Sequence, residues 1–225
     1  MAPILLIALA LAQSEKPASL LSAVDLDPAL VIPPPPARDS TQARAELAEL
    51  KTVEASRSSE QAKAAREAGE TKNATIFAGV LGPRFDLEHL PATARLMAMV
   101  RATEKEVIAR GKDHFARPRP WIVDPTLKTC KPGNEPLSSY PSGHTTNAYA
   151  MAGVLARLVP GKAPALLTRT AAYAETRITC EQHWRSDVTA GEALGLVIAE
   201  RLMAKPAFRA QFDAARAEME AAGIR

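Results

Sequence analysis

The sequence predicts an all-α protein, a single helical-bundle domain with an extended Pro-rich arm at its N-terminus. Only 4% of the 225 residues are aromatic and Ala is very frequent, whereas sheet proteins are richer in Val, Tyr and Trp. The 18 prolines favour loops between helices, because proline ends a helix. No segment shows a convincing strand-like alternation of apolar and polar residues, and no internal repeat is visible.

The overall composition excludes several classes of protein. A hydrophobic fraction of 47% and a charged fraction of 24% are typical of a globular chain, which excludes disorder of the whole chain. No apolar run approaches the ~20 residues that a helix needs to cross a bilayer, so we expect no membrane span. The net charge of +3 is small, and the dense basic stripes of nucleic-acid-binding proteins are missing. A local basic cluster for a small anion fits better.

The first twelve residues predict a signal peptide. Residues 4–12 form an uninterrupted apolar stretch, and Ala10-Leu11-Ala12 supplies the small-x-small pattern that precedes a cleavage site. The alternative, a buried N-terminal helix, is disfavoured because this stretch has neither a polar face nor a capping residue. We therefore expect secretion, which in a bacterial cell leads to the periplasm.

Residues 13–38 are expected to form the arm, and residues 39–225 the helical domain. The arm ends in four consecutive prolines, Pro33 to Pro36, which cannot be helical and favour polyproline II.

Capping-box patterns mark the start of the first two helices. Asp39 with Gln42 predicts the first N-terminus, and Ser58 with Gln61 predicts the second. In a capping box the two side chains satisfy backbone N–H groups that the first helical turn leaves free. We expect the second helix, which is rich in Ala, to end near Gly69.

The rest of the chain contains the remaining helices. An apolar stripe, with Gly111 as the residue that ends it, predicts a helix over residues 93–110. A Pro-rich loop follows over residues 118–141. Further helices are expected at about residues 145–158, 164–177, 187–204 and 206–223.

Three segments carry polar residues that are hard to explain as surface residues: 112–120, 139–145 and 176–187. In the middle segment, Ser142 and Gly143 directly precede a predicted helix, whose first N–H groups lie at the positive end of the helix dipole. Such an arrangement binds oxyanions such as phosphate. Alone, a Ser-Gly pair at a helix start is usually only a cap.

The third segment pairs a histidine with a carboxylate. His183 and Asp187 are four residues apart, so on one helical face the carboxylate would reach one imidazole nitrogen. The other nitrogen would then act as nucleophile or base. A lone pair of this kind is more often a structural hydrogen bond. Arg177 lies six residues before His183 and would reach into the same space.

The first segment adds two cations, Lys112 and Arg119. One is a flexible point charge and the other a bidentate fork, a combination suited to an anionic group. Runs of Lys and Arg are usually solvated, and we interpret Arg117 and Lys105 as surface charges of this kind.

Together these segments resemble the signature of a known family. Lys-x6-Arg-Pro over residues 112–120, Pro-Ser-Gly-His over residues 141–144 and Arg-x5-His-x3-Asp over residues 177–187 resemble the three-part signature of the phosphatidic acid phosphatase type 2 superfamily. The context Tyr-Pro-Ser-Gly-His-Thr over residues 140–145 is most similar to the class A bacterial non-specific acid phosphatases, which are secreted, soluble and all-helical. The resemblance covers roughly residues 30–205.

The resemblance implies a role for each matching residue. His183 would attack phosphorus and form a phosphohistidine, with Asp187 orienting it. His144 would protonate the leaving alkoxide and then activate the water that hydrolyses the intermediate. The groups that would hold the phosphoryl oxygens are Lys112, Arg119, Ser142, Gly143 and Arg177. The resemblance implies neither a metal nor a cofactor, because these cations stabilise the charge.

Two positions depart from the family pattern. Thr176 stands where the family usually has Ser, and its hydroxyl is retained, so little effect is expected. Ser138 stands where the class A pattern has Gly, so the family pattern does not predict the backbone shape here or the pocket wall beside it.

The remaining candidates have simpler interpretations. Cys130 and Cys180 are too few and too far apart for a zinc site, and a disulfide between the Pro-rich loop and the third motif is favoured over a reactive thiol. His89 is interpreted as a surface residue and His114 as structural or at the pocket rim. Trp184 is expected to pack against a helix, although it could wall the pocket.

These observations lead to one functional hypothesis and three alternatives. The hypothesis is an acid phosphatase, a phosphoric monoester hydrolase for soluble organic phosphomonoesters, with phosphotransferase activity towards alcohols. An acidic optimum is expected, because His183 must be neutral while His144 is protonated, close to the ~6.5 reference pKa of histidine. The alternatives are a lipid phosphate phosphatase, a vanadate-dependent haloperoxidase, and a secreted protein that binds phosphate without turnover. A homo-oligomer is compatible with the sequence.

Overall fold

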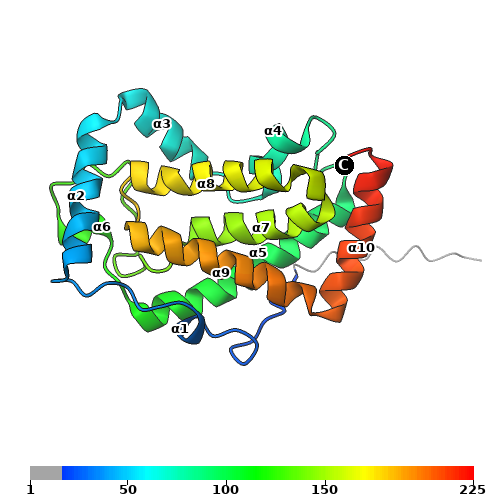
Figure 1. Ribbon diagram of the computed structural model, residues 1–225, viewed down its shortest axis with the longest axis horizontal. Helices are drawn as coiled ribbons and strands as arrows, with labels where there is room; N and C mark the ends of the chain where they lie inside the picture. The colour runs from blue at the N-terminus through cyan, green and yellow to red at the C-terminus, as the bar shows by residue number, and fades with distance from the viewer. Residues whose placement is uncertain (1–16) are drawn as a thin grey trace, which may run out of the picture.

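The computed structural model describes residues 17–225, and every regular element in that range is helical (Figure 1), which confirms the predicted all-α class. The long helices are α2 (Thr41–Ser56), α3 (Ser59–Ala68), α5 (Pro91–Phe115), α7 (Gly143–Leu158), α8 (Ala163–Thr179), α9 (Arg185–Met203) and α10 (Pro206–Ala221). The short elements are α1 (Pro28–Val31), η1 (Ala74–Phe77), α4 (Ala78–Leu81), α6 (Pro120–Val123) and η2 (Pro160–Lys162). The predicted signal peptide, residues 1–12, and residues 13–16 of the arm lie outside the described range.

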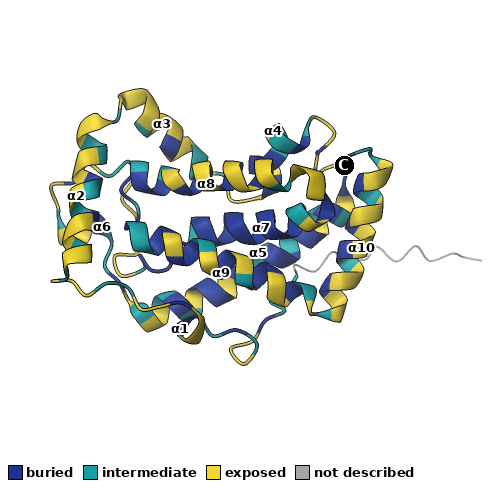
Figure 2. Ribbon diagram, in the orientation of Figure 1, coloured by how far each residue is buried: buried dark blue, intermediate teal, exposed yellow. Residues whose placement is uncertain are grey.

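Helix α7 forms the centre of the bundle, between α5, α8 and α9 (Figure 1). Its sequence is mostly small or apolar on all sides, and a helix of this kind is buried all round. Figure 2 shows α7 buried along most of its length, whereas α2, α3 and α10 keep an exposed face. Helix α10 packs across α5 and α9, and both α2 and α3 pack against α8.

Two glycines on one face of α9 let its backbone lie directly on α7. A β-carbon on Gly195 would stand 2.6 Å from the carbonyl oxygen of Thr146, and one on Gly191 would stand 2.9 Å from that of Ser142. This close approach brings the first turns of the two helices together, and the Ser142 N–H donates to the carbonyl oxygen of Asp187 over 3.0 Å. The segments that precede α7 and α9, which carry two of the predicted motifs, therefore meet.

The arm is packed along the domain. Leu21 and Leu26 are buried in the core, and Arg110 on α5 donates to the carbonyl oxygen of Leu26 over 3.1 Å. The polyproline segment is fixed by Tyr140, whose hydroxyl donates to the carbonyl oxygen of Pro33. Residues 17–38 therefore have a defined path, with the short helix α1 that the sequence did not predict.

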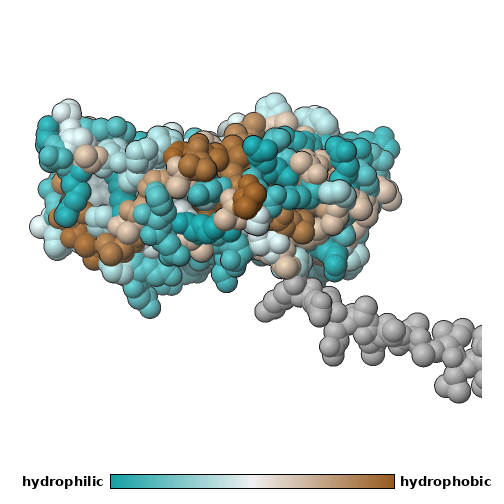
Figure 3. All heavy atoms as spheres, turned by 90° about the horizontal axis from the view of Figure 1, so that it is seen from below, coloured by the Kyte–Doolittle hydropathy of each residue, from teal (hydrophilic) through white to brown (hydrophobic). Residues whose placement is uncertain are grey.

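The arm also exposes apolar side chains. Val24 is 98% exposed and Leu30 is 86% exposed. The face seen in Figure 3 carries several separate apolar areas, divided by hydrophilic side chains. A contribution of this arm to a homo-oligomer stays a prediction.

The two predicted capping boxes have different outcomes. The box at Ser58 is confirmed, since Ser58 accepts from the Gln61 N–H over 3.2 Å and Gln61 Oε1 accepts from the Ser58 N–H over 2.8 Å. The box at Asp39 is wrong. Ser40 caps α2 instead by accepting from the Ala43 N–H over 3.1 Å, because its hydroxyl lies directly before the first helical residue.

The predicted end of the long helix α5 at Gly111 is also wrong. The helix continues to Phe115 and ends at Ala116 in the left-handed region with φ +43°. Gly111 serves close packing instead, because a β-carbon there would stand 3.1 Å from the ring of Pro141. The longer helix carries Lys112 to the edge of the site described below.

The predicted disulfide between Cys130 and Cys180 is confirmed, with the two Cα atoms 5.0 Å apart. It ties the loop before α7 to the end of α8. Arg57 at the end of α2 strengthens the same junction by donating to the carbonyl oxygens of Lys128, over 2.6 Å, and Thr179.

We predict that Gly195→Ala destabilises the protein through the α7–α9 contact. The added methyl group would overlap the backbone of α7, so the free energy of unfolding should fall by about 1–3 kcal/mol. Gly79→Ala is the matched control, because a β-carbon at Gly79 meets nothing within 4 Å, and its stability should be equal or slightly higher. Urea unfolding measures both, and equal stabilities of the two variants would contradict the predicted contact.

Candidate active site

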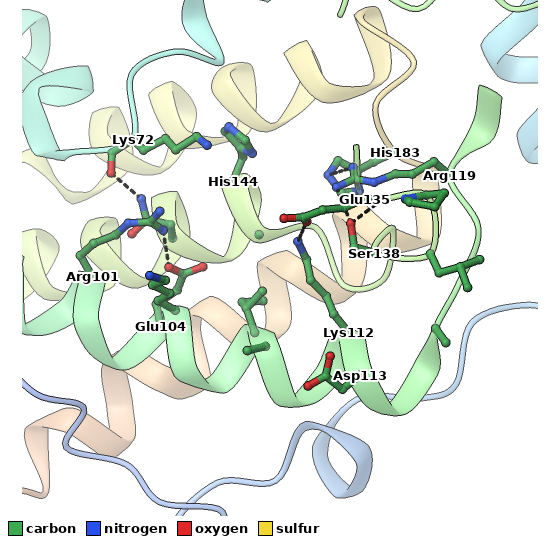
Figure 4. A pocket seen from close by; sticks show the side chains of 18 residues that line it. Lys72, Arg101, Glu104, Lys112, Asp113, Arg119, Glu135, Ser138, His144 and His183 are labelled. Carbon is green, nitrogen blue, oxygen red and sulfur yellow. Dashed lines mark hydrogen bonds and ion pairs between the residues drawn. The ribbon is translucent and has the colours of Figure 1, made fainter. Parts of the chain in front are cut away.

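A cavity of about 910 Å³ lies between α5, the start of α7 and the loops that precede α7 and α9 (Figure 4). Five of the predicted site residues line it: Lys112, Arg119, Gly143, His144 and His183. The other three, Ser142, Arg177 and Asp187, are buried close to it and do not line it. Residues far apart in the sequence are therefore brought to one cavity.

His183 lies just before α9 with its ring held at both nitrogens. Its Nδ1 is 2.8 Å from the carbonyl oxygen of Ser139, so Nδ1–H donates to Ser139. Its Nε2 accepts from Nη1 of Arg119 over 2.8 Å, and the residue lines the cavity. Burial, and then the nearby Arg119, lowers the pKa of His183 well below 6.5, which favours the neutral ring. A neutral imidazole with one nitrogen fixed is a nucleophile at the other.

Asp187 reaches one imidazole nitrogen of His183, as predicted, but the two residues do not share a helical face, because His183 precedes α9. Helix α9 begins at Arg185, and the distance from His183 Nδ1 to Asp187 Oδ2 is 3.4 Å. Asp187 also accepts from the Trp184 N–H over 2.8 Å and from the hydroxyl of Ser139. It thus holds the segment whose carbonyl oxygen orients the histidine.

Arg117 is not a solvated surface charge, as the sequence analysis proposed. It is 8% exposed, and it lies between two buried carboxylates: Nη1 is 2.6 Å from Asp187 Oδ1 and Nη2 is 2.8 Å from Glu46 Oε2. A buried carboxylate needs such a partner. The signal was present, because Arg117 and Arg119 flank Pro118 in an extended segment, where side chains two residues apart point to the same side.

Arg119 and Lys112 present their charges to the cavity. Arg119 donates to the carbonyl oxygen of Gln182 over 2.7 Å and, through Nη2, to the hydroxyl of Ser138 over 3.1 Å. Ser138, one of the two departures from the family pattern, therefore helps to fix this guanidinium. The Lys112 amine is 3.8 Å from a carboxylate oxygen of Glu135.

The N-terminus of α7 faces the same cavity. The N–H groups of Gly143 and His144 have no hydrogen-bond partner among the described residues, and no side chain caps the helix. The hydroxyl of Ser142 is 2.9 Å from that of Thr145, which keeps it away from the cavity. The unpartnered N–H groups at the positive end of a helix suit an oxyanion.

The end of α3 covers the opposite side of the site. The Nε2 of His144 is 2.9 Å from the carbonyl oxygen of Gly69, and Arg177 donates to the carbonyl oxygen of Ala65 over 2.7 Å. A β-carbon on Gly69 would overlap the guanidinium of Arg177, so a larger residue there would require this side chain to move. The hydroxyl of Thr176 accepts from Arg177 over 2.8 Å, which supports the expectation that this departure has little effect.

Four further residues of the sequence analysis can now be placed. Trp184 is buried, donates to the carbonyl oxygen of Pro118 over 2.9 Å and does not line the cavity. His89 is exposed and paired with Asp86, and His114 is exposed and outside the cavity lining. Lys105 is exposed, as expected, and also lines the cavity.

Comparisons with known proteins agree with this geometry. The model of a family described as the PAP2 superfamily matches residues 92–209, a range that includes all three motifs. An acid phosphatase of Zymomonas mobilis is 33% identical over 202 residues, which cover 87% of this chain and 76% of that protein. A non-specific acid phosphatase of Salmonella typhi is 31% identical over 196 residues, which cover 84% of this chain and 78% of that protein.

Two solved structures share the fold at low sequence identity. A transmembrane PAP2 type phosphatidylglycerolphosphate phosphatase from Bacillus subtilis has a TM-score of 0.55 and 18% identity, covering 72% of this chain and 85% of that one. LpxE from Aquifex aeolicus has a TM-score of 0.55 and 19% identity, covering 68% and 92%. Among the helices described for residues 17–225, none has the length and apolar character needed to span a membrane.

We predict that Arg117→Met strongly destabilises the protein, because it leaves Asp187 and Glu46 as buried charges without a cation. The free energy of unfolding should fall by about 3 kcal/mol or more. Arg209→Met, at an exposed arginine of α10, removes the same charge and should change stability by less than about 0.5 kcal/mol. Chemical denaturation of both variants decides the matter, and a small effect at Arg117 would refute the role assigned to it.

Proposed function

The chain belongs to the PAP2 superfamily, and on this premise we propose that it is an acid phosphatase, a phosphoric monoester hydrolase that acts on soluble organic phosphomonoesters through a phosphohistidine intermediate. The observation that supports this most is the position of His183, which lines the cavity with its Nε2 2.8 Å from the guanidinium of Arg119. A nucleophile and an anion-binding group at one point are what phosphoryl transfer requires.

In the first step of the proposed reaction, Lys112, Arg119 and the Gly143 amide bind the phosphoryl oxygens. Arg119 turns from His183 to the phosphoryl group, and the released Nε2 lone pair attacks phosphorus. The bond between phosphorus and the leaving oxygen breaks, and His144 donates a proton to that oxygen. The N–P bond to His183 thus replaces the P–O bond to the alcohol.

In the second step, water attacks the phosphorus of the phosphohistidine. His144, now neutral, accepts a proton from this water, the N–P bond breaks and His183 recovers its lone pair. Arg177 and Ser142 complete the proposed phosphate site once their side chains turn from Ala65 and Thr145, their present partners. Asp187 acts as a positioning residue through Ser139.

An acidic pH optimum follows from the environment of His144. Burial, and then the nearby Arg177 and Lys72, lowers its pKa well below 6.5, so a rising pH removes the proton that it must donate. His183 has a lowered pKa as well, which favours its neutral form. We therefore expect the activity to decrease as the pH rises and His144 loses its proton.

We also propose a periplasmic location. A disulfide between Cys130 and Cys180 persists in an oxidising compartment, and export through residues 1–12 would lead there.

The decisive experiment is hydrolysis of p-nitrophenyl phosphate from pH 4 to 9 in excess EDTA. We expect metal-independent turnover that decreases above pH 6.5, and a loss of about a thousandfold or more in His183→Ala, because the nucleophile is removed. His89→Ala is the matched control, since His89 is exposed and outside the cavity.

Three results, one from this experiment and two from assays with other substrates, would contradict the proposal. Activity that survives in His183→Ala would remove His183 as the nucleophile. A wild type that hydrolyses only lipid phosphates would favour the first alternative. Halide oxidation with vanadate and peroxide, without phosphatase activity, would favour the second.

A phosphohistidine can also react with alcohols in place of water, so we predict phosphotransferase activity. Added glycerol should yield glycerol phosphate, and the ratio of released alcohol to free phosphate should rise with glycerol concentration. Ion chromatography measures this ratio. A ratio that stays at one in concentrated glycerol would exclude transfer from the intermediate.

A further inference from the structure

The cavity extends well beyond the groups that the proposed reaction uses. In Figure 4, Arg119 and His183 lie on one side of His144, and Lys72 and Arg101 lie on the other. His144 is the proposed proton donor to the leaving oxygen. The side of Lys72 and Arg101 is therefore where the rest of the leaving group would lie.

This leaving-group side is rich in cations. The Lys72 side chain extends toward His144, and none of the ion pairs among the described residues includes it. Arg101 donates to Glu104 Oε2 over 2.5 Å, which holds its guanidinium at the cavity wall. Lys105 lines the same cavity. Of the other acids that line the cavity, Glu135 faces Lys112 and Asp113 is exposed at the rim.

Glu104 does not cancel these charges under acidic conditions. It is 1% exposed, and this burial raises its pKa to about 7, so its negative charge decreases as the pH falls below that value. It also lies close to the phosphate site, because Glu104 Oε1 and the Lys112 amine are 4.0 Å and 3.9 Å from the position that a β-carbon would take on Gly143. The cationic region and the phosphate site are therefore adjacent.

Asn147 gives an independent indication of a ligand. It is 2% exposed, lines the cavity and donates from Nδ2 to the carbonyl oxygen of Lys72 over 2.9 Å, which fixes that residue. Its Oδ1 is buried and has no hydrogen-bond partner among the described residues. A buried oxygen without a donor indicates that water or a ligand fills this part of the cavity.

We propose that Arg101 and Lys72, whose backbone Asn147 holds, form a second anion subsite that selects phosphomonoesters whose leaving group carries a further anionic group. The inference rests on the proposed phosphatase reaction and defines its substrate class. A phosphate or a carboxylate on the leaving group would meet the two cations while the reacting phosphoryl group occupies Lys112 and Arg119. A neutral polyol would leave these cations without a partner.

The test compares substrates that differ only in the distant charge. 1,4-Butanediol bisphosphate and 4-hydroxybutyl phosphate have similar leaving alcohols, so their ratio of kcat/KM reports the second anion. We expect the wild type to prefer the bisphosphate about tenfold or more, well above the statistical factor of about two from its equivalent ends. The preference should decrease at high ionic strength. The phosphate ester of 4-hydroxybutanoate distinguishes a carboxylate from a second phosphate.

Variants assign the preference to the subsite. Lys72→Gln and Arg101→Gln should each reduce the ratio severalfold, and the double variant should bring it close to two. A loss in phosphoryl transfer lowers kcat/KM for both substrates equally, so it does not change their ratio. Lys162→Gln removes the same charge from an exposed position outside the cavity lining and should keep the wild-type ratio.

The outcomes separate this inference from the proposed function. If the wild type hydrolyses both substrates with a ratio near two, the subsite is refuted while the phosphatase stands. If Lys162→Gln lowers the ratio as much as Lys72→Gln does, the preference comes from overall charge and the subsite is also refuted. If neither substrate is hydrolysed, the proposed function fails and the inference fails with it.

Discussion

The geometry of the site depends on the buried carboxylate of Asp187. Its charge is matched by Arg117, which is matched in turn by Glu46 on α2, so the chain of charges joins α2, the loop after α5 and the start of α9. Burying charges costs free energy unless each has a partner with good geometry. Asp187 also accepts from the hydroxyl of Ser139, whose carbonyl oxygen fixes the ring of His183. The chain of buried charges thereby fixes the backbone that accepts from His183 Nδ1–H, and Asp187 itself lies 3.4 Å from the same nitrogen.

Most of the fold could be predicted from local sequence patterns. The errors lie where tertiary contacts determine which residue type a position requires. Proline at the start of α10 and the capping box at Ser58 act within one helical turn, so sequence alone predicts them. Gly111 looks like a helix end, but the distant ring of Pro141 explains why glycine is there. Gly191 and Gly195 give no local signal at all, because their role is the contact between α9 and α7.

In the candidate site, too, some features could be predicted from the sequence, whereas others depend on tertiary contacts. The motifs predicted five of the residues that line the cavity, because ordered motifs with this spacing indicate a shared fold. They did not predict the partners. His183 faces Ser139 more closely than Asp187, and Arg117 is buried, since both depend on where α9 begins relative to the loop after α5. Lys72, Arg101 and Asn147 belong to no motif, and only folding brings them to one cavity.

The proposed reaction needs opposite protonation states of its two histidines, whereas burial lowers the pKa of both. The lowered pKa suits His183, which must keep a lone pair in acid, and works against His144, which must carry a proton. A bound phosphomonoester changes this balance, because its negative charge offsets the cations that lower the pKa of His144. At His183 the same ligand places phosphorus, rather than a proton, against Nε2, while Nδ1 stays bonded to Ser139. In the proposed mechanism the proton donor therefore forms mainly in the complex, and the substrate's own charge creates the protonation state that its cleavage requires.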